Sequence, residues 1–208
     1  MNRLSEEASA LMADVVFALE DGTLGDDHAC ALAQAVRRAL PWFDEEPEAG
    51  ILPLSGLARG EGMRFVGRRS RLALRLPLHR SVSAGALAGA RLDLDGILLK
   101  VGACSVRPLL PARGVVYSHF VSVDAADEIE FLERCRSQLA ARGLTPQLIS
   151  GKARELRAAD GVVRGFSLML HGLARAESLS VQEAGLGAHR TLGCGIFVPH
   201  KSVAAVGD

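Results

Sequence analysis

Four glycines near the carboxyl end of the chain are spaced as GxGxxxxxGxG. A dinucleotide-binding fingerprint follows a strand, opens a helix and has its third glycine at position 190, where this chain has Arg190. Glycine lets backbone amides approach a phosphodiester closely, which favours a phosphate-binding loop over a tight turn that only needs left-handed backbone. The residues expected to make such contacts are Gly185, Gly187, His189, Arg190, Gly193, Gly195 and Lys201.

Basic residues gather in two further segments. Residues 59–80 hold seven arginines against the single carboxylate of Glu61, and a second basic cluster lies within 152–157. On a strand, Arg71 and Arg75 would share one face. Such clusters are typical of surfaces that follow RNA phosphates, and an ordinary solvated strand face is the alternative. The RNA contacts expected from these segments are Arg68, Arg69, Arg71, Arg75, Arg154 and Arg157.

The formal net charge is zero, with 24 basic and 24 acidic residues among 208, which by itself argues against a nucleic-acid partner. The charge is unevenly spread along the chain, however. Residues 1–48 contain 11 acids and three bases and carry −8, so the other 160 residues carry +8. We therefore expect the early acids to face away from a basic track, except for Asp26 and Asp27.

The elements that would position these residues occur in the same order twice. In the first half, residues 11–20 read as a strand, a helix capped by Asp26 or Asp27 ends before Pro41, and residues 50–57 and 70–78 read as strands. A short helix over 81–88 precedes an extended stretch, 90–106, that bends at Asp95-Gly96.

The second half repeats this pattern after a linker at Pro108, Pro111 and Gly114. Residues 114–123 read as a strand, and Asp124, with Asp127 three residues on, resembles a capping box for a helix over 125–142. Two strands, a short helix over 174–184 and a last strand over 194–200 follow. The order predicts an α+β fold of two tandem ferredoxin-like βαββαβ units, at 1–110 and 111–208. A single α/β domain with a mostly parallel sheet is the competing fold.

Composition excludes several classes of protein. The four cysteines form no CxxC pair and have no histidine at zinc-finger spacing, so we expect free thiols in a reducing cytoplasm and no metal. Glu6 and Glu7 interrupt the position where a signal peptide needs an apolar core, and no stretch approaches a membrane span, so we expect no membrane partner. Aromatic residues make up 4% of the chain, which argues against a base-stacking platform.

Residues 185–201, GLGAHRTLGCGIFVPHK, closely resemble the glycine-rich loop of the RAMP superfamily. Within it the chain resembles the CRISPR repeat-processing endoribonucleases, especially the compact version of the myxan-type systems. Further resemblances cover most of the chain, at residues 25–42, 149–157 and 164–173. The resemblance implies two ferredoxin-like units and metal-independent cleavage within each repeat by the 2′-hydroxyl, leaving a 2′,3′-cyclic phosphate, with no cofactor.

The same resemblance implies the catalytic residues. His28 matches a catalytic histidine near the start of the first helix and should be half exposed there. Lys152 matches a lysine that stabilises the transition state in some relatives, in a loop between the second and third strands of the second unit. Relatives often pair the histidine with a tyrosine, but the only tyrosine here is Tyr117, far from His28 in the sequence, so the general acid is left open.

The expected partners are the stem-loop of a CRISPR repeat RNA and the other subunits of a type I effector complex. Two alternatives stay open from the sequence. The chain could be a non-catalytic RAMP subunit that only holds guide RNA, or a tandem ferredoxin-like regulatory or small-molecule-binding protein unrelated to RNA. Only the endoribonuclease and the RAMP subunit are expected to bind RNA with an affinity that weakens steeply with salt.

Overall fold

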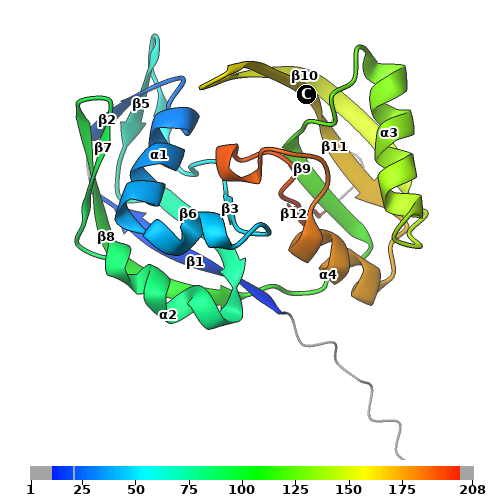
Figure 1. The fold of residues 1–208 in the computed structure, drawn as a ribbon, viewed down its shortest axis with the longest axis horizontal. Coiled ribbons are helices and arrows are strands. Elements are labelled where there is room, and N and C mark those ends of the chain that lie inside the picture. The colour runs from blue at the N-terminus through cyan, green and yellow to red at the C-terminus, as the bar shows by residue number, and fades with distance from the viewer. Residues whose placement is uncertain (1–10, 21, 202–208) are drawn as a thin grey trace, which may run out of the picture.

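The computed structural model describes residues 11–20 and 22–201, which form two antiparallel sheets with their helices and one small extra sheet (Figure 1). The first sheet has the strand order β3-β6-β1-β8-β7. Its strands and helices are β1 (Met12–Leu19), α1 (Ala29–Ala39), β3 (Gly50–Ile51), β6 (Arg71–Pro77), α2 (Ser81–Ala84), β7 (Arg91–Leu94) and β8 (Ile97–Pro108).

The second sheet has the order β10-β11-β9-β12. Its elements are β9 (Val115–Val121), α3 (Glu128–Ala140), β10 (Gln147–Ala158), β11 (Gly161–His171), α4 (Arg175–Ala184) and β12 (Val198–Pro199). In both sheets the strands that come first and third in their unit lie together at the centre, and a helix follows each of them. This is the ferredoxin-like arrangement, so the predicted fold class of two such units is confirmed.

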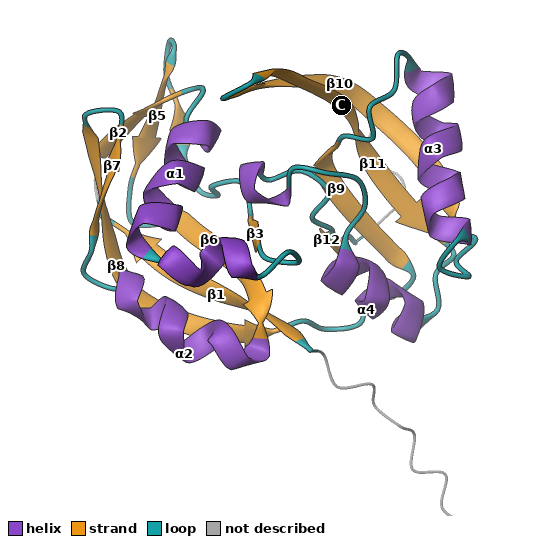
Figure 2. Ribbon diagram, viewed as in Figure 1, coloured by secondary structure: helices purple, strands orange, loops and turns teal. Residues whose placement is uncertain are grey.

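Alternation along the strands explains how the first sheet forms its core. Leu72, Leu74 and Leu76 of β6 are fully buried on one face, where they join Val15 and Phe17 of β1 and the apolar side of α1. Figure 2 shows the helices of this unit on that side of the sheet. Asp95 and Gly96 both have positive φ and join β7 to β8, as the predicted bend requires.

Helix starts differ from the expectation. His28 occupies the N-cap position of α1, so neither Asp26 nor Asp27 caps this helix. In the second unit the cap is Asp127, whose side chain accepts a hydrogen bond from the Glu130 amide at 2.9 Å, and α3 begins at Glu128 rather than at 125. Both predictions were wrong in the same way, because another residue within three positions of the predicted cap took its place.

A third sheet was not expected from the sequence. It has the order β2-β5-β4, and its strands come from the connections that precede α1 and β6. They are β2 (Gly22–Gly25), β4 (Ala58–Arg59) and β5 (Met63–Val66). The strand predicted over 50–57 is correspondingly reduced to β3, and the last strand predicted over 194–200 is reduced to β12.

One position on the outer face of the first sheet lies against the second unit, and this overturns one predicted RNA contact. Arg75 of β6 is 1% exposed and binds both carboxylate oxygens of Asp14, at 2.8 and 3.0 Å. Its guanidinium also donates to the carbonyls of Gln182 and Phe197, at 3.0 and 2.5 Å. Arg75 therefore joins the two units, and the prediction that it shares a solvent-facing RNA track with Arg71 is wrong.

In the part of the chain that the structure describes, no helix is both long enough and apolar enough to cross a membrane.

Candidate active site

His28 lies at the amino end of α1 with its ring half-buried. Its Nδ1 is 2.8 Å from the carbonyl oxygen of Gly25. A carbonyl only accepts hydrogen bonds, so Nδ1 must carry the proton in this contact. In the neutral ring the other nitrogen, Nε2, then has a free lone pair. The backbone of the β2 to α1 connection thus holds His28 in the tautomer that a general base needs.

The glycine-rich segment reaches the same place from the other end of the chain. His28, Leu52 and Thr191 are among the residues that line a small cavity of about 30 Å³. Arg37, on the last turn of α1, donates a hydrogen bond of 3.2 Å to the Thr191 hydroxyl. Thr191 lies in a short 3₁₀ helix, η4 (Arg190–Leu192). The sequence did not predict this contact, because Thr191 and Arg37 are far apart in the chain and no local pattern pairs them.

The hairpin of β10 and β11 completes the surroundings of His28. Its tip lies beside the amino end of α1 in Figure 1, and Arg157 Nε is 3.5 Å from Asp27 Oδ2. On the other side, Arg64 Nε is 2.5 Å from Asp26 Oδ1. The two acids that precede His28 are therefore each paired with an arginine from a different strand. Three segments distant in sequence meet at this histidine.

Lys152 is not in a loop, as predicted, but within β10. The pairing of β10 with β11 shifts between Ser150 and Ala153, so Lys152 sits at a bulge and is exposed. It precedes Arg157 by five residues, about 16 Å along an extended strand. The structure therefore brings Arg157, rather than Lys152, to the amino end of α1.

The glycine-rich loop uses its amides internally, which overturns part of the predicted phosphate contact. The Gly187 amide donates to Gln138 Oε1, the Gly193 amide to the Arg190 carbonyl and the Gly195 amide to the Phe120 carbonyl. Gly185, Gly193 and Gly195 are also buried. Of the predicted loop glycines, only Gly187 is exposed, and its amide is already bonded.

Close packing explains why two of these positions are glycine. A Cβ at Gly195 would lie 2.0 Å from the Leu186 carbonyl oxygen, and one at Gly187 would lie 2.2 Å from that of Ser122. Both residues also have a positive φ. These glycines fold the loop against β9, which is the tight-turn alternative of the sequence interpretation rather than a cradle of free amides.

Arg190 is a second predicted RNA contact that the structure places inside the protein. Its Nε donates to the Glu48 carbonyl and its Nη2 to the Glu183 carbonyl, both at 3.0 Å. Burial, assisted by the nearby charge of Arg75, lowers the pKa of Arg190 to about 10. The guanidinium also fills the space beside Gly185, where a Cβ would lie 1.9 Å from Nη1. Arg190 fastens the loop to both units.

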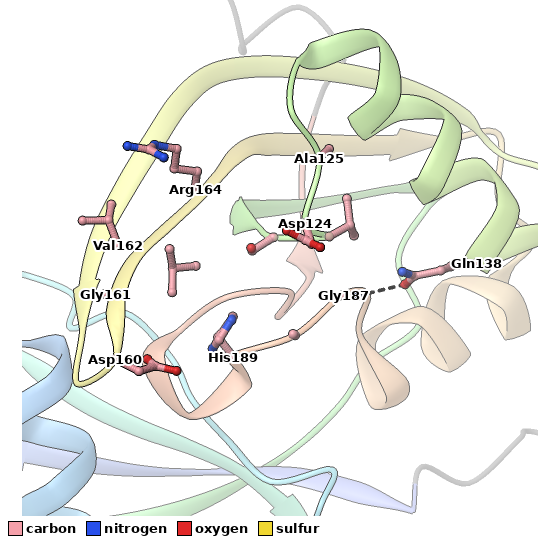
Figure 3. Close-up of a pocket in the computed structure, with 13 residues that line it drawn as sticks. Asp124, Ala125, Gln138, Asp160, Gly161, Val162, Arg164, Gly187 and His189 are labelled. Carbon is pink, nitrogen blue, oxygen red and sulfur yellow. Dashed lines mark hydrogen bonds between the residues drawn. The ribbon is translucent and has the colours of Figure 1, made fainter.

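His189 is the exposed side chain of this loop. It has left-handed backbone, with φ of 62°, and lines a cavity of about 650 Å³ between the loop, the end of β9 and the tip of the β10 to β11 hairpin. Figure 3 shows its ring between Asp160 and Asp124, with Arg164 across the cavity. His189 therefore keeps its predicted access to a ligand, in a cavity that is also lined by two carboxylates that the sequence interpretation did not associate with it.

The remaining predicted contacts lie on the surface. Arg68, Arg69, Arg154 and Lys201 are exposed, and none of them forms an ion pair with a described residue. Arg71 is half-buried, and its Nη1 donates to the carbonyls of Arg68 and Ser70. These exposed cations can reach a ligand without breaking an existing salt bridge.

The separation of charge along the sequence is not a separation in space. Acids of the first 48 residues pair with bases that come later in the chain. The expectation that these acids face away from the basic track is wrong for Asp14, Glu45 and Glu46, whose partners lie in the basic segment 59–80. The pairs are Asp14 with Arg75, Glu20 with Lys100, and Glu45 and Glu46 with Arg80, besides the two beside His28.

Within the described ranges, no group of three or more His, Cys, Asp or Glu side chains is arranged to hold a metal ion.

Known proteins are similar to this chain in sequence along almost its whole length. The sequence model of the Cas6 CRISPR family matches residues 13–202. The chain is 34% identical over 198 residues to the CRISPR-associated endonuclease Cas6 of Myxococcus xanthus (strain DK1622), an alignment that covers 93% of this chain and 84% of that protein.

Solved structures with low sequence identity share the fold. A Cas6-related protein from Pyrococcus furiosus is similar with a TM-score of 0.66 at 12% identity, over 90% of this chain and 98% of that one. Thermus thermophilus Cse3, bound to an RNA that represents a pre-cleavage complex, is similar with a TM-score of 0.52 at 15% identity, over 90% and 98% of the two chains. Fold and sequence together establish that the chain belongs to the Cas6 family of CRISPR-associated endonucleases.

Proposed function

We propose that the protein is a metal-independent endoribonuclease that cuts CRISPR precursor RNA within its repeats. The observation that carries the proposal is the 2.8 Å contact of His28 Nδ1 with the Gly25 carbonyl, which leaves Nε2 free beside an exposed basic hairpin. Membership of an endonuclease family supports it, as does the exposure of cations on the strands around the site. Because its substrate is a transcript, we expect the enzyme to act in the cytoplasm.

The reaction needs one base, one acid and stabilisation of charge on phosphorus. Nε2 of His28 takes the proton of the 2′-hydroxyl, and the 2′-oxygen forms a bond to the adjacent phosphorus. The bond from phosphorus to the 5′-oxygen breaks, and that oxygen takes a proton from solvent, to which protonated His28 then returns the proton that it accepted. The products are a 2′,3′-cyclic phosphate and a 5′-hydroxyl. Arg157 is the cation at hand for the phosphorane, with Lys152 as the second candidate.

Binding of the repeat stem rests on surface cations from both units. Arg68, Arg69 and Arg154 are exposed and free of described carboxylates, so they can hold RNA phosphates, with Arg68 and Arg69 available to an A-form stem. His189 and Lys201 add contacts from the carboxyl end of the chain. We further propose that the units divide at residues 110 and 111, and that the protein joins other subunits of a type I effector complex after cleavage.

Product analysis tests this mechanism directly. Purified protein is incubated with a repeat stem-loop RNA in the presence of EDTA, and with the same RNA carrying a single 2′-deoxy substitution at the scissile nucleotide. We expect unchanged cleavage with EDTA, a 2′,3′-cyclic phosphate end, and no cut in the deoxy substrate. Loss of activity in EDTA, or cleavage of the deoxy substrate, contradicts the mechanism.

The alternative of a non-catalytic RNA-binding subunit makes a different prediction for the same experiment. Such a protein would bind the stem-loop with the same salt dependence and leave it intact. A protein unrelated to RNA would show no salt-sensitive binding, whereas each phosphate contact adds to the slope of affinity against salt concentration.

A further inference from the structure

A second group of histidines lies on the sheet of the second unit, away from His28. Tyr117 and His119 are two residues apart on β9, and His200 follows β12, whose Val198 pairs with Tyr117. The Tyr117 and His119 rings meet edge to face with their centroids 5.0 Å apart. The Tyr117 and His200 rings are 5.6 Å apart. We call these three residues the β9 cluster.

The helices of the second unit do not cover this cluster. Val116, the neighbour of Tyr117 on β9, is buried in the core with Phe131 of α3 and Val181 of α4. Successive residues of a strand point to opposite faces of the sheet, so Tyr117 points away from these helices. Figure 2 shows α3 and α4 beside the second sheet with the strands facing the middle of the molecule. His119 is exposed, and the Tyr117 side chain is half-buried.

A cation stands beside the rings. Arg154 of β10 pairs with Gly165 of β11, and Met169, four residues further along β11, pairs with Tyr117, so Arg154 lies on the same face of the sheet as Tyr117. Its charge, after burial, contributes to lowering the pKa of His119. The direction of this shift favours a neutral His119 ring. Arg154 forms no ion pair with a described residue, so its charge is available. Aromatic faces next to an uncompensated arginine are complementary to a nucleotide, whose base stacks and whose phosphate is negative.

The position of the cluster links it to the proposed cleavage site. Arg154 precedes Arg157 by three residues on β10, and Arg157 meets Asp27 beside His28. An RNA strand that leaves the site at His28 can therefore follow β10 to the β9 cluster. Bases of a duplex are stacked and paired, so only an unpaired segment can offer its base faces to these rings.

We propose that the β9 cluster, with Arg154, is a binding site for an unpaired segment of the RNA substrate. One or more bases stack on Tyr117 and its neighbouring histidines, and Arg154 contacts the phosphate. This inference rests on the proposed function for the identity of the substrate as RNA. It also revises the expectation that a chain with so few aromatic residues lacks a stacking platform, because its only tyrosine is at the centre of this cluster.

The single tyrosine provides a reporter that needs no mutation. Protein labelled with 3-fluorotyrosine gives one ¹⁹F signal, which comes from position 117. The probes are a repeat stem-loop with a single-stranded flank, the same stem-loop without the flank, and inorganic phosphate. We expect the signal to shift and saturate with the flanked RNA only. A shift of the same size with the blunt stem-loop or with phosphate, or no shift with any probe, overturns the proposal.

Three substitutions measure the contribution to affinity for the flanked RNA. Tyr117→Leu removes the ring and is expected to weaken binding about ten-fold, while Tyr117→Phe keeps the ring and is expected to bind as the unsubstituted protein does. Arg154→Ala, at an exposed position, should weaken binding and lower its salt dependence. Affinity for the blunt stem-loop should change less in Tyr117→Leu than affinity for the flanked RNA. Equal losses for both RNAs contradict the proposal.

His28→Ala separates this inference from the proposed function. It lies outside the β9 cluster, so the ¹⁹F titration in this variant should match that of the unsubstituted protein. If the unsubstituted protein cleaves the RNA normally but shows no flank-dependent shift, the proposed binding site is wrong and the enzyme assignment stands. If the unsubstituted protein binds the flank but cleaves no RNA, the enzyme assignment is wrong and the binding site stands.

Discussion

The surroundings of His28 and of the β9 cluster differ in their chemistry. His28 has charged neighbours, since Asp26 and Asp27 each pair with an arginine, and one of its nitrogens is fixed by the Gly25 carbonyl. The β9 cluster has aromatic neighbours and one free cation, Arg154, and no described carboxylate pairs with that cation. A fixed tautomer suits proton transfer, whereas exposed rings suit binding.

The comparison teaches that histidine content alone does not locate a catalytic centre. A general base needs a defined lone pair directed at the substrate, which a hydrogen bond to its other nitrogen supplies. A ring that contacts other rings is instead held as part of a surface. The two histidine sites should therefore respond in opposite ways when kinetics and affinity are measured separately.

The largest effect is expected for His28→Ala. Removing a general base lowers the rate by about 10²- to 10⁴-fold, so single-turnover cleavage at saturating protein should fall at least 100-fold with RNA affinity little changed. His119→Ala is the matched control, for which we expect weaker binding and a nearly normal rate at saturation. Normal cleavage by His28→Ala would break the comparison, because the catalytic role would then belong elsewhere.

The next effect concerns the joint that holds both sites in one body. Arg75→Met leaves the Asp14 carboxylate and the carbonyls of Gln182 and Phe197 without their buried partner. Loss of one member of such a buried pair costs about 3–5 kcal/mol. We expect that loss in the free energy of unfolding, measured by urea denaturation.

Substituting both partners separates charge from packing at this joint. In Asp14→Leu/Arg75→Met no carboxylate is left unpaired, so the double variant should recover part of the stability lost in Arg75→Met. If the double variant loses as much free energy of unfolding as the two single variants lose together, the two side chains act independently and the joint lies elsewhere.

Arg75 also marks the limit of what the sequence predicts. The alternation of Leu72, Leu74 and Leu76 correctly predicted a strand with one buried face. It could not predict that Arg75 on the opposite face is buried, because its partners Gln182 and Phe197 lie 107 and 122 residues later in the chain. The same limit applies to Arg190, whose partners are backbone carbonyls of Glu48 and Glu183.

Local signals predicted elements better than boundaries or contacts. The Asp95-Gly96 bend and the tandem order of elements were confirmed, since turn chemistry and periodicity act over a few residues. The third sheet was missed because β2, β4 and β5 are strands of two to four residues without a clear alternation. The amides of the glycine-rich loop were misjudged because two of their acceptors, Gln138 and Phe120, lie on other elements.

Arg157→Ala is expected to have an intermediate effect on cleavage. Because its guanidinium is beside Asp27 next to His28, we expect cleavage to fall about ten-fold, which corresponds to about 1.4 kcal/mol. Lys152→Ala tests the competing assignment and should have a smaller effect on the rate. If Lys152→Ala is the more damaging of the two, the hairpin contacts RNA differently from the arrangement in this structure.

Asp27→Ala tells whether Arg157 acts on RNA or only positions the hairpin. If the Asp27 to Arg157 contact merely positions the tip, both alanine variants and their combination should lower the rate equally. If Arg157 contacts the phosphate, Asp27→Ala should retain most of the activity. The salt dependence of RNA binding adds an independent readout, because only the loss of a phosphate contact reduces the slope of affinity against salt concentration.

The smallest effect concerns the pH response of the β9 cluster. Desolvation of the partly covered ring, and secondarily the charges of Arg154 and His200, lower the pKa of His119 below its usual 6.5. The unfolded chain therefore binds a proton more readily, so the stability that a neutral His119 provides is present above pH 6.5 and is lost as pH falls through the folded pKa. His119→Gln should flatten this part of the stability profile, as measured by urea unfolding between pH 5 and 7.5. Arg154→Ala should raise the pKa of His119, observed by NMR titration of its ring, whereas an unchanged pKa would show that Arg154 is not close enough to serve the β9 cluster.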